Sequence, residues 1–281
     1  MDLIERLSYN PAITRVITRL RLREFSRKLY WRWKRPPDGI LTLRVGQIRA
    51  RFHIWGLEAL RFFETYSSQG AKRGGEREIL ELLTTEARPG DVVFDIGSNV
   101  GLYAVLLAKA VGSSGKIVAF EPHLQSCRRL TQNLELNNLE NVRSFSKALS
   151  DKTGKATLHV GSVNGNFSLV EPLAQTVAEE QQVEVIEGDR LREEEMLPLP
   201  TVVKIDVEGY EHAVIRGLRQ TLAQPSCRLL CCEIHPWLLQ AGSGPDDILS
   251  LVQSLGFRRI DTYPPRPGGG FHIVAYKDVS S

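Results

Sequence analysis

The sequence has no apolar run long enough to cross a membrane. The longest one near a predicted helix, Val100 to Val111, is shorter than the roughly 20 residues that a span requires, and it contains Lys109. The amino terminus, MDLIERLSYN, has early acidic residues and no continuous apolar core, so it is unlike a secretory signal. We therefore expect a cytoplasmic protein.

Cysteine is also scarce, with four residues in 281. Their spacing contains no CxxC pair, which argues against a zinc clip, and the last three fall in one apolar run: Cys127, Cys227, Cys231 and Cys232. We expect buried thiols without chemistry of their own. The sequence shows no internal repeat and no low-complexity tract, and its 42% hydrophobic and 25% charged residues are typical of a globular protein.

Positive charge is concentrated in a leader, residues 1–36. This segment holds ten Lys or Arg against Asp2, Glu5 and Glu24, a net charge of plus seven, whereas the whole chain carries plus three. Residues 37–281 therefore carry a net charge of minus four (plus three less plus seven). This charge implies no continuous basic groove, and we expect no nucleic-acid substrate. Apolar residues recur in the leader at helical spacing and predict a basic amphipathic helix: Ile13, Val16, Ile17 and Leu20.

A basic amphipathic helix of this kind has three uses. It can lie on an anionic membrane surface with Trp31 and Trp33 as interfacial anchors, it can contact a partner protein, or it can pack as a solvated cap on the domain that follows. The sequence leaves these open, so we expect a cytoplasmic protein that either is free or is peripheral to the membrane.

The leader is followed by a short lead-in, residues 37–75. Pro36-Pro37-Asp38-Gly39 breaks the helix, and apolar residues then alternate with polar ones over 41–45 and 48–54, on either side of Gly46-Gln47. This pattern predicts a β-hairpin. A helix pattern starts at Glu76, where we place the beginning of the domain proper, 76–281.

In the domain, apolar runs alternate with helix-like segments. This order predicts an α/β fold with a mostly parallel sheet, helices on both faces, and ligands bound at the carboxyl ends of the strands. Two final runs, 257–262 and 270–276, have no helix between them and should form an antiparallel hairpin. The earlier predicted strands are 92–96, 116–120, 142–148, 201–207 and 227–234, and the helices are 101–111, 123–136, 210–222 and 246–255.

The turn after the first of these strands reads FDIGSNVGLY. A dinucleotide site requires G-x-G-x-x-G, but Gly97 and Gly101 here lack the middle glycine, and Asp95 precedes them. A carboxylate there repels phosphate and attracts a cation, which favours S-adenosylmethionine over NAD. Glu121, 20 residues past Gly101 at the end of the second strand, can accept hydrogen bonds from ribose hydroxyls in either ligand. A turn glycine with an N-capping acid is the alternative.

Two further strand ends carry titratable residues. In VVKIDVEGYEHAVIRGL, Lys204, Asp206 and Glu208 share one face of a predicted strand, where they could bind the donor, orient an acceptor hydroxyl or remove its proton. The alternative is an ion-pair cluster that only steadies the strand. Glu233 and His235 end the next strand, and His235 is either a general base near neutral pH or a structural histidine.

These motifs resemble the FkbM family of class I S-adenosylmethionine-dependent methyltransferases. The similarity extends over about 76–276 and is carried by VVFDIGSNVGLYAVLLA, KIVAFEPH, KALSDKTGKATLHV and above all VVKIDVEGYEHAVIRGL. It implies a Rossmann-like fold with a seven-stranded sheet, and O-methylation of a hydroxyl on a sugar, a polysaccharide or glycolipid, or a polyketide-type small molecule. N-methylation of an amino sugar or a protein, and a non-catalytic nucleotide-binding module recruited by the leader, are the rival interpretations.

The resemblance also implies roles for single residues. The turn would bind the methionine end of the donor, Glu121 the ribose, and the KALSD segment the adenine, while the strand ends would flank the methyl group and the acceptor. The implied donor residues are Asp95, Gly97, Ser98, Asn99, Gly101, Glu121, Ala148, Asp151 and Asp206, and the implied catalytic residues are Asp206, Glu208, Glu233 and His235.

The implied reaction is a direct displacement in which Asp206 or His235 removes the acceptor proton. A divalent ion could be held by Asp206, Glu233 and His235, but their spacing does not demand one, and we predict no metal. The acceptor itself is left open. The loops expected to form its pocket, 161–200 and 235–246, contain no recognisable motif.

Overall fold

A computed structural model of the chain describes residues 30–67, 76–161, 167–169, 177–239, 243–263 and 270–277. The predicted amphipathic helix of the leader lies outside these residues. The described part begins with a helical turn at 30–34 that ends before Pro36, as the sequence indicates. Trp31 packs against the core, while Trp33 is 56% exposed. Within the described ranges, no helix combines the length and apolar character that crossing a membrane requires.

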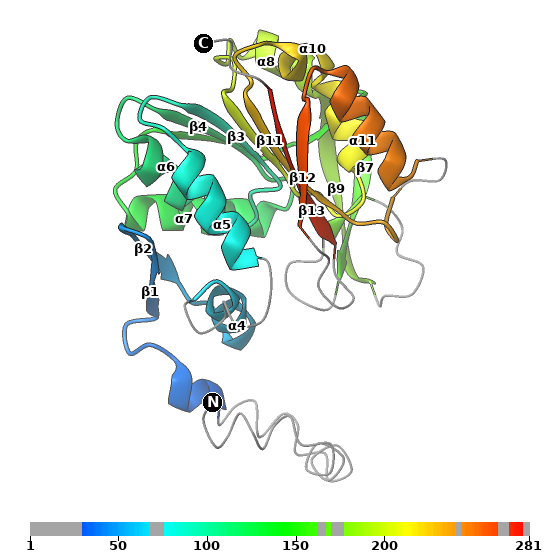
Figure 1. Ribbon diagram of the computed structural model, residues 1–281. Helices are drawn as coiled ribbons and strands as arrows, with labels where there is room; N and C mark the ends of the chain where they lie inside the picture. Colours follow the sequence, from blue (N-terminus) through cyan, green and yellow to red (C-terminus); the bar gives the residue numbers. More distant parts are fainter. Residues whose placement is uncertain are drawn as a thin grey trace.

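The centre of the molecule is a seven-stranded sheet with the order β12-β13-β11-β10-β3-β4-β5 (Figure 1). Five neighbouring strands pair in parallel, and β13 runs antiparallel to both β11 and β12. The predicted parallel sheet with a closing hairpin is therefore confirmed. The strands are β3 (Val92–Ile96), β4 (Lys116–Phe120), β5 (Val142–Phe145), β10 (Val202–Ile205), β11 (Leu229–Ile234), β12 (Arg259–Tyr263) and β13 (Phe271–Tyr276).

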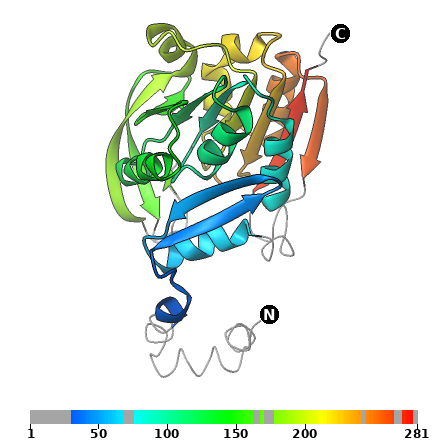
Figure 2. The same cartoon turned by 90° about the vertical axis from the view of Figure 1, so that its left-hand side faces the viewer.

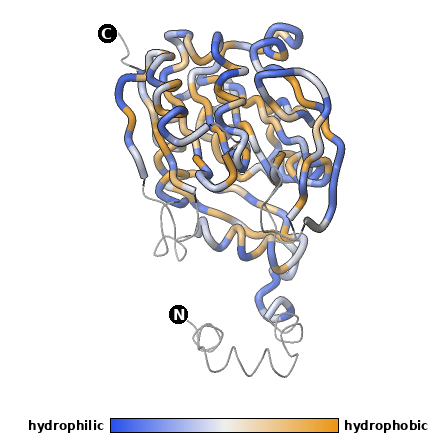
Figure 3. Tube along the Cα trace, turned by 90° about the vertical axis from the view of Figure 1, so that its right-hand side faces the viewer, coloured by the Kyte–Doolittle hydropathy of each residue, from blue (hydrophilic) through white to orange (hydrophobic). Residues whose placement is uncertain are grey.

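Helices cover both faces of this sheet because its strands are apolar on both sides. Val93 and Ile117 point into one core and their neighbours Phe94 and Val118 into the other. Hydrophobic residues, orange in Figure 3, accordingly gather in the interior. The first face packs against α5 (Glu76–Glu86), α6 (Leu102–Val111) and α7 (Leu124–Leu136), and the second against α8 (Gly188–Glu194), α9 (Glu211–Gly217), α10 (Arg219–Ala223) and α11 (Pro245–Ser254).

The lead-in packs into the first of these two cores. The predicted hairpin forms from β1 (Ile40–Val45) and β2 (Ile48–His53), and a helix that the sequence analysis missed, α4 (Leu57–Thr65), lies with it at one end of the domain (Figure 2). Asn133, fully buried on α7, joins the hairpin to the glycine turn. Its Oδ1 accepts from the His53 backbone N–H at 2.9 Å, and its Nδ2 donates to the Val100 carbonyl at 2.8 Å.

The structure corrects three parts of the predicted element list. The apolar run 142–148 is not one strand, because β5 ends at Phe145 and β6 (Ala148–Ser150) joins a second sheet with the order β6-β9-β7-β8. The predicted strand 201–207 ends at Ile205, so Asp206 and Glu208 lie in the following turn. The predicted helix 210–222 is two helices that meet at Leu218.

The second sheet also replaces much of the expected loop 161–200. It contains β7 (Gly154–Gly161), β8 (Phe167–Ser168) and β9 (Val177–Glu187), and α8 follows it. A small core, Ala148, Leu158, Val183 and Val185, lies under these strands, while Leu149 and Ile186 join the second core of the central sheet. Because β9 carries polar residues over more than half of its length, including Glu179-Glu180-Gln181-Gln182, its sequence lacks the apolar run that identified the central strands.

All four cysteines are free thiols. Those at 227, 231 and 232 are buried, as predicted, whereas Cys127 is only half-buried. Burial raises the pKa of both Cys227 and Cys231 to about 12, which keeps these thiols protonated and unreactive.

Candidate active site

A cavity of about 250 Å³ opens at the carboxyl ends of the strands, where β3 lies between β4 and β10. This is the topological switch point at which sheets of this type bind ligands. Many elements contribute to its lining, which comprises Phe62, Thr65, Tyr66, Glu76, Ile96, Gly97, Asn99, Phe120, Glu121, Pro122, Lys147, Ala148, Leu149, Leu158, Leu169, Asp206, Val207, Glu208, Tyr210 and Glu233.

The glycine turn forms the floor of the cavity. Gly97 has φ of 80°, and a Cβ at this position would lie 1.8 Å from the Asp206 carbonyl oxygen, so only glycine lets the two strand ends approach. The backbone N–H groups of Gly97 and Ser98 donate to the Phe120 carbonyl, and Gly101, with φ of 87°, precedes the first turn of α6. Gly97 and Asn99 face the cavity, whereas Ser98 and Gly101 shape the turn behind it.

Asp95 lies beneath this turn and is fully buried. Its Oδ1 is 3.6 Å from Lys204 Nζ, which is also 3.3 Å from Asp206 Oδ2 and stacks on the Tyr103 ring. Burial would lower the pKa of Lys204, but Asp206 and Asp95 raise it above its usual value, so the ammonium stays charged. Although burial opposes ionisation of Asp206, Lys204 holds the pKa of that carboxyl below its usual range. The cation that Asp95 meets in the structure is therefore Lys204, and Asp95 does not reach the cavity wall.

Glu121 is held at the end of β4 by two backbone donors. Its Oε2 accepts from the Asn99 N–H and its Oε1 from the His123 N–H, both at 2.8 Å. Each oxygen keeps a lone pair, and Glu121 lines the cavity, so the carboxylate can accept two more hydrogen bonds there. Burial raises the pKa of Glu121 to about 7, and the two N–H donors act in the opposite direction.

Apolar side chains beside Glu121 form the wall on which a flat ring could pack. They include Phe120, Ala148 and Leu149. Asp151, expected next to the adenine, is not part of this wall. Its carboxylate faces Arg216, with 3.5 Å between Oδ2 and Nε.

On the other side of the cavity, His235 lies among three carboxylates. Its Nδ1 is 2.8 Å from Glu211 Oε1, and its Nε2 is 3.4 Å from Glu208 Oε2 and 3.6 Å from Glu233 Oε1. Burial would lower the pKa of His235, but the hydrogen bond to Glu211 and the charge of Glu208 raise it to about 10. This environment disfavours His235 as a general base near neutral pH, because the ring already holds its proton.

The Glu-Gly-Tyr-Glu string forms the tight turn that presents Glu208. Glu208 itself has φ of 52°, an unfavourable region for a non-glycine residue, and a Cβ on Gly209 would lie 2.2 Å from the Leu238 carbonyl oxygen. The buried Glu211 closes the turn by accepting from the Gly209 N–H at 2.9 Å. Burial raises the pKa of Glu208 to about 8, against the effect of His235.

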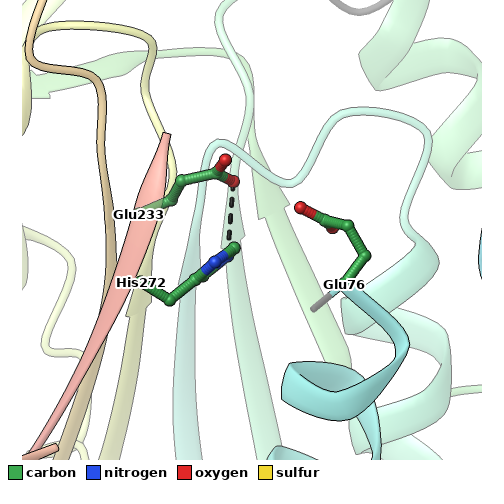
Figure 4. A group of neighbouring side chains, drawn as sticks. All are labelled: Glu76, Glu233 and His272. Carbon is green, nitrogen blue, oxygen red and sulfur yellow. Dashed lines mark ion pairs between the residues drawn. The ribbon is translucent and has the colours of Figure 1, made fainter. Parts of the chain in front are cut away.

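Several residues in or beside the cavity were missed because no local motif marks them. Tyr66 and Phe62 come from α4 and its end, and Tyr66 donates its hydroxyl to Glu76 Oε2 at 2.5 Å. His272 Nε2 lies 3.3 Å from Glu233 Oε2 (Figure 4). The predicted closing hairpin could have pointed to His272, since β13 brings that residue directly opposite Glu233 on β11.

Two groups of side chains could hold a metal ion within the described part of the chain. One is Glu76, Glu233 and His272, and the other is Asp206, Glu208 and His235. The trio considered from the sequence, Asp206, Glu233 and His235, is divided between the two groups.

Comparison with known proteins supports one family. Residues 95–259 match the model of the methyltransferase FkbM domain. The hexuronic acid methyltransferase AglP of Haloferax volcanii is 32% identical over 180 residues, which cover 63% of this chain and 68% of AglP. The 31-O-demethyl-FK506 methyltransferase FkbM of Streptomyces tacrolimicus is 26% identical over 219 residues, covering 68% of this chain and 82% of that protein.

Among solved structures, a methyltransferase FkbM from Methylobacillus flagellatus KT aligns with a TM-score of 0.47 and 13% identity. The alignment covers 79% of this chain and 60% of that one.

Proposed function

The chain belongs to the FkbM family of S-adenosylmethionine-dependent methyltransferases, and from this premise we propose that it methylates a hydroxyl oxygen of a sugar, a glycan or glycolipid, or a polyketide-type small molecule. Two relatives support the acceptor class, since one is named for a hexuronic acid and the other for an oxygen of FK506. The observation that carries the proposal is a cavity with a single carboxylate, Glu121, on one side and four on the other: Glu76, Asp206, Glu208 and Glu233.

The side around Glu121, the donor half, fits S-adenosylmethionine. Glu121 offers one spare lone pair on each oxygen to the two ribose hydroxyls, and Phe120, Ala148 and Leu149 offer an apolar wall to the adenine. Gly97 and Asn99 line the cavity beside Glu121 and would contact the methionine end. When bound, S-adenosylmethionine supplies a methyl group on a sulfonium, which an acceptor oxygen can take by direct displacement.

The four carboxylates form the acceptor half and would orient hydroxyl groups. Carboxylates accept hydrogen bonds from several hydroxyls at once, and positioning of this kind contributes up to about 7–11 kcal/mol in well-oriented reactions. Asp206 is the natural positioning group, because it lines the cavity and its ion pair with Lys204 keeps it ionised.

Glu208 is the proposed proton acceptor. Its pKa of about 8 lies near the working pH, which is where a general base is most effective. His235, fixed by Glu211, holds a positive charge against Glu208 and thereby favours the ionised form that can accept a proton. Proton removal of this kind adds about 100- to 10,000-fold to the rate.

The acceptor atom is tested by product analysis. The purified chain is incubated with S-adenosylmethionine and three acceptor sets: neutral glycans, hexuronic-acid glycans and amino sugars. The proposal predicts a product heavier by one methylene group that survives mild alkali, as an ether does. An alkali-labile ester, or a methyl group on nitrogen, would overturn O-methylation of a hydroxyl.

N-methylation is the second candidate, and the same four carboxylates favour it, because they attract the ammonium form of an amino sugar or a protein side chain. The amine must lose its proton before it can accept a methyl group, so the chemistry again needs a base. Methylated amino sugar from the assay above would select this candidate.

The proposed partners are a glycan or small-molecule acceptor and, for residues 1–36, an anionic membrane surface or a partner protein in the cytoplasm. Flotation of the chain on anionic liposomes, with and without residues 1–36, tests the membrane contact. Equal flotation of the two forms would exclude it. The absence of a nucleic-acid substrate stays a prediction, which tight, salt-sensitive RNA or DNA binding would refute.

A further inference from the structure

Glu76, Glu233 and His272 converge on one point in the acceptor half from three different elements (Figure 4). One ligand atom from each lies within 4.8 Å of the other two. All three residues are more than nine-tenths buried, with exposed fractions of 3%, 8% and 7%. Glu76 and Glu233 also line the cavity, so the convergence point adjoins the place proposed for the acceptor.

The fold holds these side chains in place. Glu233 and His272 are directly opposite each other on β11 and β13, which puts both on the same face of the sheet. Glu76 is the first residue of α5, and the Tyr66 hydroxyl binds its Oε2 at 2.5 Å. The group is thus built by contacts across 196 residues of sequence separation (272 less 76) rather than by a flexible loop.

The charge around the cavity favours a further cation. Lys204, His235 and His272 form ion pairs with five buried or half-buried carboxyl groups, so the carboxyl groups outnumber their cationic partners: Asp95, Asp206, Glu208, Glu211 and Glu233. Carboxylates gathered at low solvent exposure repel one another unless protons or cations neutralise them. A divalent cation would offset this excess.

We propose that Glu76, Glu233 and His272 bind a divalent metal ion, with Mn²⁺ as the best match. Two carboxylates favour Mg²⁺, Ca²⁺ or Mn²⁺, and an imidazole favours Zn²⁺ and other transition metals, so Mn²⁺ satisfies both ligand types. Ligand atoms about 2.1 Å from an ion lie about 3 to 4.2 Å apart. The 3.3 Å between Glu233 Oε2 and His272 Nε2 fits this range. The ligand atom of Glu76 lies within 4.8 Å of the other two, so only a small movement of its side chain would bring it to the same ion.

The other group, Asp206, Glu208 and His235, is the weaker site. Asp206 already pairs with the Lys204 ammonium at 3.3 Å, and this charge would repel an incoming ion. Both ring nitrogens of His235 already face carboxylates, Nδ1 that of Glu211 at 2.8 Å and Nε2 that of Glu208 at 3.4 Å. His272, by contrast, meets the carboxylate of Glu233 at its Nε2.

Three protein ligands leave coordination positions for oxygens of the acceptor. A metal there would bind a hydroxyl or a neighbouring carboxylate of a sugar and lower the pKa of that hydroxyl. It would also let a cavity lined by four carboxylates accept a negatively charged sugar. This consequence rests on the proposed function, whereas binding of the ion does not.

The test is a titration of the full chain with Mn²⁺, after removal of metals by a chelator and with neither donor nor acceptor present. Free Mn²⁺ is followed by its electron paramagnetic resonance signal. We expect one ion per chain, at least about tenfold weaker binding in both His272→Gln and Glu76→Gln, and binding close to that of the unaltered chain in Glu208→Gln, which alters only the other group.

Absence of Mn²⁺ binding by the unaltered chain would overturn the proposal, and so would binding that is lost in Glu208→Gln but kept in His272→Gln and Glu76→Gln. Calorimetry with S-adenosylmethionine on the same samples shows whether each variant is folded. If His272→Gln is not folded, the comparison of Glu76→Gln with the unaltered chain decides the outcome. Ion binding without methylation of any hydroxyl would refute the proposed function alone.

Discussion

The two halves of the cavity are built in different ways. The donor half comes from short segments near one another in the sequence: Gly97 and Asn99 follow β3, Glu121 follows β4, and Ala148 begins β6. The acceptor half takes its four carboxylates from positions 76 to 233, on α5, β11 and the turn after β10. On the proposed assignment, cofactor recognition is therefore local in the sequence, whereas acceptor recognition depends on long-range packing.

The halves also differ in charge. The donor half contains a single carboxylate, Glu121, which two backbone N–H groups hold in place. The acceptor half contains four carboxylates, with the His235 ring and Lys204 behind them. Changes in the donor half should weaken binding of S-adenosylmethionine, and changes in the acceptor half should lower turnover while leaving donor binding intact.

The largest expected effect on turnover is that of Glu208→Gln. Glutamine keeps the shape but cannot take up the acceptor proton, so kcat should fall about 100- to 10,000-fold while the Kd of S-adenosylmethionine stays the same. Single-turnover kinetics and calorimetry measure the two quantities. Glu135→Gln, on the exposed face of α7, is the matched control. A Glu208→Gln enzyme with normal kcat would remove Glu208 from the mechanism.

Gly97→Ala should damage both halves, because this glycine separates them. The new Cβ would lie 1.8 Å from the Asp206 carbonyl oxygen at a φ of 80°, and strain plus displacement should cost about 2–4 kcal/mol of the free energy of unfolding. Gly112→Ala is the control, since Gly112 has φ of 68° but no atom within 4 Å of the added Cβ. Denaturant unfolding compares the two variants. Equal losses would mean that the close approach to Asp206 does not matter.

Glu121→Ala should act on the donor half alone. Loss of the hydrogen bonds from a charged group should weaken S-adenosylmethionine binding about 10- to 100-fold. Asp151→Asn is the informative comparison, because the carboxylate of Asp151 faces Arg216 instead of the cavity, and we expect its Kd to be unchanged. Weaker binding of S-adenosylmethionine by the Asp151→Asn variant would instead indicate that Asp151 contacts the adenine.

The pH dependence separates the halves further. Activity should rise as Glu208 ionises near pH 8 and fall as His235 loses its proton near pH 10. Ionisation of Glu208 should have the opposite effect on stability: the free energy of unfolding falls as activity rises. Because burial raises its pKa from 4.5 to about 8, its contribution to the free energy of unfolding is complete below 4.5 and is lost as pH rises through 8.

The corresponding contribution of His235 is complete below 6.5 and is lost as pH rises through about 10. Between about pH 4.5 and 8, the thermal stability of Glu208→Gln should therefore depend less on pH than that of the unaltered chain. An identical pH dependence of the two proteins would contradict the claim that burial raises the pKa of Glu208.

The smallest effect is expected where the lead-in meets the domain. Asn137 accepts from the Arg51 N–H at 3.0 Å and donates to the Arg51 carbonyl at 2.7 Å, both at the surface. Asn137→Ala should cost about 0.5–1.5 kcal/mol in denaturant unfolding and leave the Kd of S-adenosylmethionine unchanged. A changed Kd would show that the hairpin influences the donor half.

The same contrast explains what the sequence could predict. The central sheet could be predicted because its strands are apolar on both faces. Glu121 and the glycine turn could be predicted because they directly follow such strands. The second sheet could not, because β9 covers a small core and carries polar residues over more than half of its length. Glu76 and His272 belong to ordinary helix and strand patterns, and only the three-dimensional register brings them together beside Glu233.

Protonation states also required the structure. His235 has the usual sequence context of a candidate base, but Glu211, 24 residues away, accepts the hydrogen bond that keeps it charged. Asp95 was interpreted as a group that attracts the donor, and in the fold it meets Lys204 instead. In both cases a buried neighbour, which the sequence does not identify, determines the charge that a ligand would meet.

The most direct test of the account is calorimetric titration of the chain, Glu121→Ala and Glu76→Gln with S-adenosylmethionine. Two separable halves predict that the unaltered chain and Glu76→Gln bind the donor with the same Kd and that Glu121→Ala binds it about 10- to 100-fold more weakly. A donor affinity that Glu76→Gln lowers as much as Glu121→Ala does, or no donor binding by the unaltered chain, would contradict the account.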